Sequence, residues 1–416
     1  MTHTVMTFVA KVKPDSVQVL GNLLEQIGAD PENNSLVPFR SLKSLHFASF
    51  VLHQSADYGA YLIFENNFDG TLDDFLPDLY SKASAGLHQI YSCCQGYTVS
   101  NAPDQQGLVR YLRQHVVRPN AYHIGNTGRS VDRILQEQKL RDALETEADG
   151  LVKKGQPNTP RTLLASLQKF VSNRPEWSWV PGAGPRQTFA EKYAPYVKFV
   201  GAIPPALILF FPALIALLVL RYKESIDPIQ IDAADTQSVQ KLVEKEDHTR
   251  SVQNHMASIT IVKPGWLRQA ALWTVLAAIN LIAHVFFTDG ELGGIPSIHF
   301  AHWSLIDNGR RLLFLSNFDG SWENYLDDFI DKAAHGLTGV WSNTLNFPRT
   351  YFLIWGGATD GSRFKAVARN SQIVTNAWYS AYRDLTVQGI DNNSRIREDI
   401  FVTKDAKSTK AWLRRL

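Results

Sequence analysis

Cysteine is almost absent from this chain of 416 residues, and its only two cysteines, Cys93 and Cys94, are neighbours. Adjacent cysteines are poorly placed for a structural disulfide, and they do not form the Cys-x-x-Cys spacing of a metal site. This usage fits a reducing compartment. The N-terminal residues 1–8 also lack a basic segment followed by an apolar run, so we expect no signal peptide.

Several signatures of catalysis are also missing. The sequence has no glycine-rich phosphate loop, no nucleophile elbow and no His-Glu-x-x-His zinc motif. Charged residues make up 20% of the chain and the formal net charge is +2, so the strongly basic footprint of a nucleic-acid-binding protein is excluded. No motif names a substrate, and we expect no nucleic-acid partner.

One stretch occurs twice and organises the chain. The segment FENNFDGTLDDFL at residues 64–76 returns as FLSNFDGSWENYL at residues 314–326, so Asp319 follows Asp69 by 250 positions. We interpret the chain as a tandem duplication. The same offset or a slightly larger one matches further pairs, namely Val12-Lys13-Pro14 with Val262-Lys263-Pro264, His46-Phe47-Ala48 with His299-Phe300-Ala301, and Asn120-Ala121-Tyr122 with Asn376-Ala377-Trp378.

The hydrophobic pattern predicts the element order β-α-β-β-α in both copies. In the first copy we expect strands over 6–12, 45–52 and 61–65, helices over 16–27 and 71–91, a turn at 66–70, a further strand near 95–99, and added helices over 104–116 and 130–144. In the second copy we expect strands over 258–262, 298–305, 311–316 and 350–355, and a helix capped by Ser321.

An apolar insert separates the copies. Residues 199–220 carry no charge and would extend about 33 Å as a helix, which is enough to cross a bilayer, although Pro204, Pro205 and Pro212 would kink it. A second run, residues 269–288, has no charged residue other than His284. We expect membrane attachment by a return crossing or by a monotopic anchor in one leaflet, with both repeats facing the cytoplasm. The alternative is a buried helix of a soluble protein.

These patterns predict an α+β protein in which two tandem ferredoxin-like repeats pack sheet to sheet and carry an inserted, membrane-associated helical segment. The predicted parts are residues 1–145 as the first repeat, 146–250 as a linker with the membrane segment 199–220, and 251–416 as the second repeat. Trp177 and Trp179 in the linker are expected at a membrane interface.

The candidate site residues belong to the second copy. Asp319, in the Asn-Phe-Asp-Gly motif, and His299 are acid–base candidates, but both occur in the first copy too, so a scaffold role is the alternative. His335 replaces an alanine of the first copy, and His284 is an ionisable group inside an apolar run. Arg311 is a candidate for holding an acidic group, and the alternative for it is a solvated surface.

The repeated β-α-β-β-α order, with His-Phe-Ala opening each hairpin, resembles the dimeric α/β-barrel superfamily. That superfamily includes the haem-dependent dye-decolourising peroxidases and chlorite dismutases, as well as cofactor-free monooxygenases and isomerases. The resemblance implies a helix histidine as the iron ligand, which would be His335 or His284, with Asp319 or an arginine such as Arg311 on the distal side. The peroxidase signature Gly-x-x-Asp-Gly is matched only at its end, because Ser316 stands where its first glycine belongs.

We therefore expect a membrane-attached oxidoreductase, haem-dependent and peroxidase- or oxygenase-like, that acts on a lipophilic small molecule. Two alternatives stay open. One is a non-catalytic membrane module that binds lipid or protein. The other is a cofactor-free acid–base enzyme of the same fold that uses His299 or His335 with Asp319.

Overall fold

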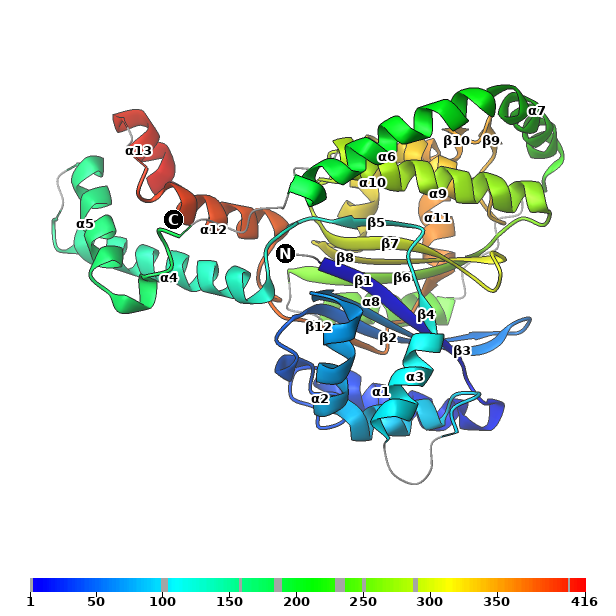
Figure 1. The fold of residues 1–416 in the computed structure, drawn as a ribbon, viewed down its shortest axis with the longest axis horizontal. Helices are drawn as coiled ribbons and strands as arrows, with labels where there is room; N and C mark the ends of the chain where they lie inside the picture. The colour runs from blue at the N-terminus through cyan, green and yellow to red at the C-terminus, as the bar shows by residue number, and fades with distance from the viewer. Residues whose placement is uncertain are drawn as a thin grey trace.

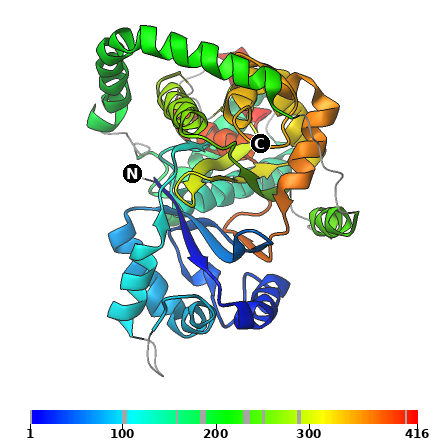
Figure 2. The same ribbon diagram turned by 90° about the vertical axis from the view of Figure 1, so that its right-hand side faces the viewer.

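The computed structural model describes residues 3–98, 104–156, 159–182, 189–228, 236–248, 252–286, 291–402 and 405–416, and every structural statement below concerns these residues. They form an α+β protein of 13 α-helices, two five-stranded antiparallel sheets and a small two-stranded sheet (Figures 1 and 2). This architecture is compatible with a ferredoxin-like fold.

The first sheet has the strand order β12-β2-β3-β1-β4, and helices α1, α2 and α3 cover its outer face (Figure 1). A capping box between Thr71 and Asp74 begins α2, as the sequence predicts. The bounds are β1 (His3–Lys11), β2 (Leu45–Ser55), β3 (Gly59–Asp69), β4 (Val116–Val117), β12 (Ala377–Ser380), α1 (Val17–Ala29), α2 (Leu72–Ser92) and α3 (Gln105–Gln114).

The second sheet has the strand order β11-β6-β8-β7-β5, and helices α9, α10 and α11 cover its outer face. Ser321 caps α10, which confirms the predicted start of this helix. The bounds are β5 (Ala121–Ile124), β6 (Gln253–Ile261), β7 (Ile298–Ile306), β8 (Arg311–Asp319), β11 (Gln372–Ile373), α9 (Trp266–Phe286), α10 (Trp322–Trp341) and α11 (Gly361–Ser371).

Each sheet takes one edge strand from the other half of the chain. Strand β5 of the N-terminal half pairs with β7, and β12 of the C-terminal half pairs with β2. An asparagine before each of these strands accepts from a backbone N–H of its new neighbour. Asn120 Oδ1 lies 2.8 Å from the Leu305 nitrogen, and Asn376 Oδ1 lies 2.8 Å from the Leu52 nitrogen. The exchange interlocks the two halves.

The inner faces of the two sheets pack against each other. Val51 and Ile63 of the first sheet are fully buried in one cluster with Leu313 and Leu315 of the second. Strands buried on both faces carry near-continuous apolar runs instead of strict alternation, which explains the pattern of residues 45–51.

Four helices extend away from the sheets, on the left of Figure 1. They are α4 (Val131–Lys153), α5 (Pro160–Ser172), α12 (Val387–Asp399) and α13 (Ala406–Leu413), and they share a small apolar core. Trp177 and Trp179 pack partly buried against this core, and the guanidinium of Arg133 lies 4.8 Å from the Trp179 ring centroid. The predicted boundary at residue 145 falls within α4.

The apolar insert forms two helices, α6 (Phe189–Ile208) and α7 (Phe210–Ile226), joined at an 84° bend. The bend follows Pro204 and Pro205, as expected for prolines near the end of a helix. Helix α8 (Thr236–His248) follows α7, and β9 (Thr350–Tyr351) pairs with β10 (Trp355–Gly356) in the small sheet.

Three local predictions are wrong. Residues 66–69 continue β3 instead of forming a turn, because the sheet interface buries and hydrogen-bonds their polar side chains. Residues 95–98 form no strand, and only an isolated bridge joins Cys94 to Val12. Residues 350–355 do not form one strand: a tight turn separates β9 from β10, because Phe352 and Leu353 adopt positive φ angles of 51° and 68°.

Candidate functional site

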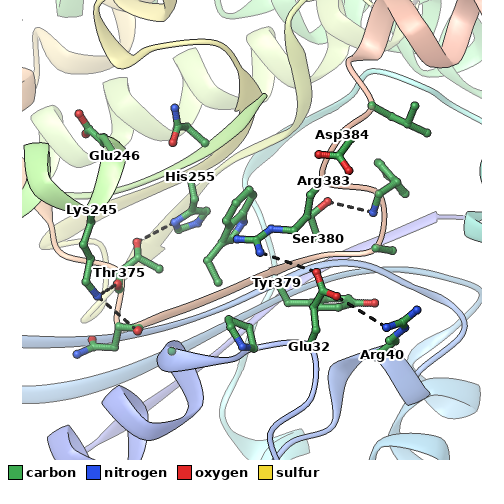
Figure 3. A pocket seen from close by; sticks show the side chains of 18 of the residues that line it. Glu32, Arg40, Lys245, Glu246, His255, Thr375, Tyr379, Ser380, Arg383 and Asp384 are labelled. Carbon is green, nitrogen blue, oxygen red and sulfur yellow. Dashed lines mark hydrogen bonds and ion pairs between the residues drawn. The ribbon is translucent and has the colours of Figure 1, made fainter. Parts of the chain in front are cut away.

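A cleft of about 1160 Å³ opens between the two halves, beside α8 (Figure 3). Its walls come from the end of α1, from α4 and α8, and from the chain that leads from β11 to β12. Aromatic side chains Trp378, Tyr379 and Tyr382 line it together with charges of both signs. The charged lining residues are Glu32, Arg40, Asp142, Lys245, Glu246, Arg383 and Asp384. This lining favours a polar ligand.

His255, on β6, lines the cleft and reaches a carboxylate buried behind it. Its Nδ1 lies 2.8 Å from Thr375 Oγ1, a contact that Figure 3 shows, and its Nε2 lies 2.9 Å from Glu65 Oε2. Thr375 precedes β12 and Glu65 lies on β3, so three distant segments meet here.

Glu65 is fully buried between the two sheets. Its Oε1 accepts from the side-chain amides of Asn67 (2.9 Å) and Asn317 (3.0 Å), and its Oε2 accepts from the Ser49 hydroxyl (2.9 Å). Burial alone would raise the pKa of Glu65, but His255 and the other donors lower it to about 2. The group is therefore a carboxylate at neutral pH.

The carboxylate sets the roles of the His255 nitrogens. Because an ionised Glu65 only accepts, the His255 Nε2 carries a proton, which leaves Nδ1 as the ring nitrogen that can accept from the Thr375 hydroxyl. A second histidine, His302, places its Nδ1 3.9 Å from Glu65 Oε1 and its Nε2 2.9 Å from Thr7 Oγ1. Burial lowers the pKa of His302 to about 4, so its ring is uncharged at neutral pH.

Sequence reasoning missed this site, although a signal was present. At the offset of 250, Glu65 aligns with Leu315 and His255 aligns with Val5, so both polar residues are specific to one half. A histidine that occurs in only one copy is a site candidate, and on the helices this criterion points to His335. Applied to the aligned strands of the two copies, the same criterion points to Glu65 and His255.

The structure does bring the predicted His299 and Asp319 together. His299 Nε2 lies 2.7 Å from Asp319 Oδ1, and Asp319 Oδ2 accepts from the backbone N–H of Val387, the first residue of α12, at 2.8 Å. In the first half, Asp69 makes equivalent contacts with His46 and with Val131, the first residue of α4. A carboxylate at a helix N-terminus stabilises it, so this pair can act as a structural anchor.

We expect Asp319→Asn to lower the free energy of unfolding by about 1–3 kcal/mol. Each carboxylate oxygen of Asp319 faces a different partner, His299 or the Val387 N–H, whereas an asparagine has only one acceptor oxygen and no charge. Urea unfolding measures the change. Asp57→Asn, at an exposed position, serves as the matched control and should change little. An Asp319→Asn protein as stable as the control would contradict the anchoring role.

His3, His46 and Asp69 place one potential ligand atom each within 4.8 Å of one another. These atoms already face protein partners. His3 Nε2 accepts from the Gly128 N–H, His46 Nδ1 lies 2.8 Å from the Tyr382 hydroxyl, and both rings reach Asp69 through their other nitrogen. The arrangement fits a hydrogen-bonded support for α4 better than a metal centre.

Arg311 lies at the opposite end of β8 from Asp319, so the structure does not join it to the His299 pair. Its Nε bonds to Asp307, and its guanidinium lies between the rings of Tyr58 and Tyr61, at 4.3 and 4.4 Å from their centroids. This environment is a buried cation–π contact.

His335 is exposed on α10, and its Nδ1 lies 3.0 Å from the carbonyl oxygen of Ile354. The cavity beneath this helix, next to Phe329 and Leu337, measures about 20 Å³, which is room for about one water molecule. These surroundings do not fit a haem on His335. His284 lies in α9, but its side chain is outside the described residues.

No protein-family model matches the chain, and a comparison with curated proteins finds no match. The resemblance to dye-decolourising peroxidases and chlorite dismutases therefore has no support from relatives. The function has to be inferred from the geometry described above.

Proposed function

We propose that the protein is a membrane-attached binding module that rests on one face of a bilayer, with both halves on the cytoplasmic side and the cleft as its ligand site. The observation that carries this proposal is the exposed apolar surface of α6 and α7. Its large exposed side chains, called the apolar face below, are Val197, Val200, Ile203, Leu207, Ile208, Leu209, Phe210, Phe211, Leu214, Ile215, Leu218 and Val219. A surface of this extent marks an interaction site.

Three helices gather at this end of the molecule. Helices α6 and α9 run close together along the top of Figure 1, and α7 lies beside the β9–β10 hairpin at their end. Among the described helices, residues 266–283 of α9 are long and apolar enough to cross a membrane, with 22% of that window buried, and α6 with α7 qualifies only as a bent pair. Exposed aromatic residues border the region, as at a membrane interface: Trp266, Trp273, Tyr351 and Trp355.

The C-terminal end of α7 is fastened to the second half. Glu224, 3% exposed, accepts from the Thr350 hydroxyl (2.6 Å) and from the backbone N–H groups of Phe352 and Leu353 (both 2.9 Å). Phe352 and Leu353 are the residues of this turn with positive φ angles, so the carboxylate stabilises a backbone conformation that their side chains disfavour.

One turn later, Asp227 Oδ2 lies 2.8 Å from Lys263 Nζ and 2.6 Å from Arg268 Nη2. Arg268 is in the first turn of α9, and Tyr196 of α6 reaches the Val285 carbonyl near the other end of α9. Both helices of the insert therefore return to the same body. This favours a monotopic anchor over a single crossing, which would separate the halves.

We also propose that the two halves are ferredoxin-like repeats whose sheets pack as in a dimeric α/β barrel. The repeated element order, the exchanged edge strands and the matched Asp69 and Asp319 anchors support it.

A liposome flotation assay tests the attachment. Four aspartates on the apolar face (Ile208→Asp, Phe211→Asp, Ile215→Asp and Leu218→Asp) should lower the membrane-bound fraction at least about tenfold, since a loss of 1.4 kcal/mol already gives that factor. The matched control carries four aspartates at exposed apolar positions elsewhere: Val19, Leu135, Val152 and Val402. Equal flotation of the two variants would place the anchor elsewhere, and no flotation of the native protein would end the proposal.

Haem dependence and a lipophilic substrate stay predictions. An absorption spectrum of the purified protein after haem supplementation tests the first, because a bound haem gives a Soret band that His335→Ala should remove if that residue ligates iron.

A further inference from the structure

We propose that Thr375, His255 and Glu65 form a hydroxyl–imidazole–carboxylate triad that hydrolyses polar carboxylic esters bound in the cleft. This goes beyond membrane attachment and does not depend on it. A triad is recognised by geometry and by the role of each group, not by sequence order. No sequence motif identifies this triad, because its members come from the N-terminal half, the start of the second half and the segment that leads into the exchanged strand β12.

The three groups are arranged in series. Thr375 Oγ1, His255 and Glu65 are joined by contacts of 2.8 and 2.9 Å, within the range for a nucleophile, its base and the group that orients the base. The His255 side chain is 2% exposed, whereas Thr375 is half-buried and lines the cleft. A substrate in the cleft therefore meets the hydroxyl first.

The supporting contacts hold each member in place. Both Glu65 oxygens are occupied by fixed donors, which prevents the carboxylate from turning away from His255. Thr375 is held through its neighbour Asn376, whose side chain bonds to the backbone of β2. A site held on rigid strands in this way keeps its reacting groups aligned.

A cation lies against the backbone of Thr375. Lys245 of α8 places its Nζ 2.5 Å from the Thr375 carbonyl oxygen and 3.4 Å from that of Asn376, as Figure 3 shows. A positive charge held at the residue that carries the nucleophile favours the negative charge that develops on an ester carbonyl oxygen. Lys245 is thus a positioning and electrostatic residue of the site.

The chemical step follows from these roles. The Thr375 oxygen forms a bond to the ester carbonyl carbon while its proton passes to His255 Nδ1, and Glu65 stabilises the imidazolium. The C–O bond to the alcohol then breaks, and the alcohol leaves with the proton from His255. Water attacks the acyl-threonine through the same base, which releases the carboxylic acid and restores the hydroxyl. No oxidant, reductant or metal takes part.

The cleft indicates the substrate class. Charges of both signs and three aromatic side chains surround the hydroxyl, so the substrate we infer is an ester that carries polar or charged substituents.

Hydrolysis of p-nitrophenyl acetate, followed by absorbance and by mass spectrometry of an acetyl group on Thr375, tests the triad. Thr375→Val keeps the side-chain shape and removes the nucleophile, so the rate should fall at least about 100-fold. Thr375→Ser should retain the activity and the adduct, and His255→Gln should lose both. Thr146→Val, an exposed threonine on α4, is the matched control and should hydrolyse at the native rate.

Thermal unfolding of each variant separates a lost triad from a lost fold. If His255→Gln does not fold, the comparison of Thr375→Val with Thr375→Ser still decides the matter. A folded Thr375→Val protein that hydrolyses the ester as fast as the native one, or an acetyl group found on another residue, would overturn the proposal. Membrane flotation of Thr375→Val should stay native, so failure of the triad and failure of the membrane anchor give different results.

Discussion

Glu65→Leu alone is expected to lower the free energy of unfolding by about 3–5 kcal/mol, because several buried hydrogen-bond donors lose their acceptor at a cost of about 1–3 kcal/mol each. The substitution would leave the amides of Asn67 and Asn317 without their acceptor in a region closed to water. His255 would lose its carboxylate partner as well. Urea unfolding followed by circular dichroism measures the change.

The repeat suggests a second substitution that should offset part of this loss. At the repeat-equivalent positions the chain has Leu315 in the second half and Val5 in the first, and both side chains are apolar and buried. The double variant Glu65→Leu with His255→Val copies these residues, and we expect it to recover part of the lost stability, because no imidazole is then left buried without its acceptor, whereas the amides of Asn67 and Asn317 still are. The single variant His255→Val completes the cycle, and if the losses of the two single variants simply add in the double variant, the two side chains are not energetically coupled.

Much of the fold is predictable because local rules decide it. The capping box at Thr71 and the cap at Ser321 fix the starts of α2 and α10, and the hairpin pattern fixes β2–β3 and β7–β8. These features depend on residues close together in sequence. The repeat then transfers each local prediction from one half to the other.

What the sequence does not reveal depends on pairing between distant segments. Asn66 and Asn67 look like turn residues, yet they are buried strand residues because Asn67 shares the carboxylate of Glu65 with the other sheet. The exchange of β5 and β12 left only the short Asn-Ala motif as a trace. The apolar residues Phe352 and Leu353 are typical of a strand. They form a turn instead, because Glu224, more than a hundred positions earlier in the sequence, accepts hydrogen bonds from their backbone N–H groups.

The candidate site shows the same limit. Its three members are adjacent only after the sheets pack and the edge strand crosses, so no spacing along the chain predicts them. The predicted His299 and Asp319 do meet, because both lie at the ends of neighbouring strands within one hairpin. Sequence reasoning thus found the local pair, while the pair between halves required the structure.

The apolar face of α6 and α7 and the cleft lie on different sides of the molecule. Helix α6 crosses the top of Figure 2, whereas α8, which walls the cleft, lies on the flank nearer the junction of the two sheets. A monotopic anchor in this orientation leaves the cleft open to the aqueous phase. The charged lining agrees with that exposure, and it favours a substrate that arrives from solution at the membrane surface.

Acid is expected to destabilise the protein through its buried histidines. Burial lowers the pKa of His302 to about 4 from the ordinary value of 6.5, so between pH 6.5 and 4 the unfolded chain binds a proton that the folded protein does not. Stability contributed by the uncharged ring is therefore present above pH 6.5 and is lost as pH falls towards 4. For His302 the loss is about 3 kcal/mol, at 1.36 kcal/mol for each pKa unit.

His302→Gln removes this titration while keeping a polar partner for Thr7, so its urea midpoint should fall less between pH 7 and pH 4 than that of the native protein. His335→Gln, at an exposed position, should follow the native curve.

Burial also lowers the pKa of His46 and of His53, so a smaller acid dependence should persist in His302→Gln. Below pH 4.5 a further loss is expected in both proteins as Glu65, with its lowered pKa of about 2, begins to bind a proton in the unfolded chain. Identical curves for His302→Gln and His335→Gln would mean that the buried ring does not govern acid stability.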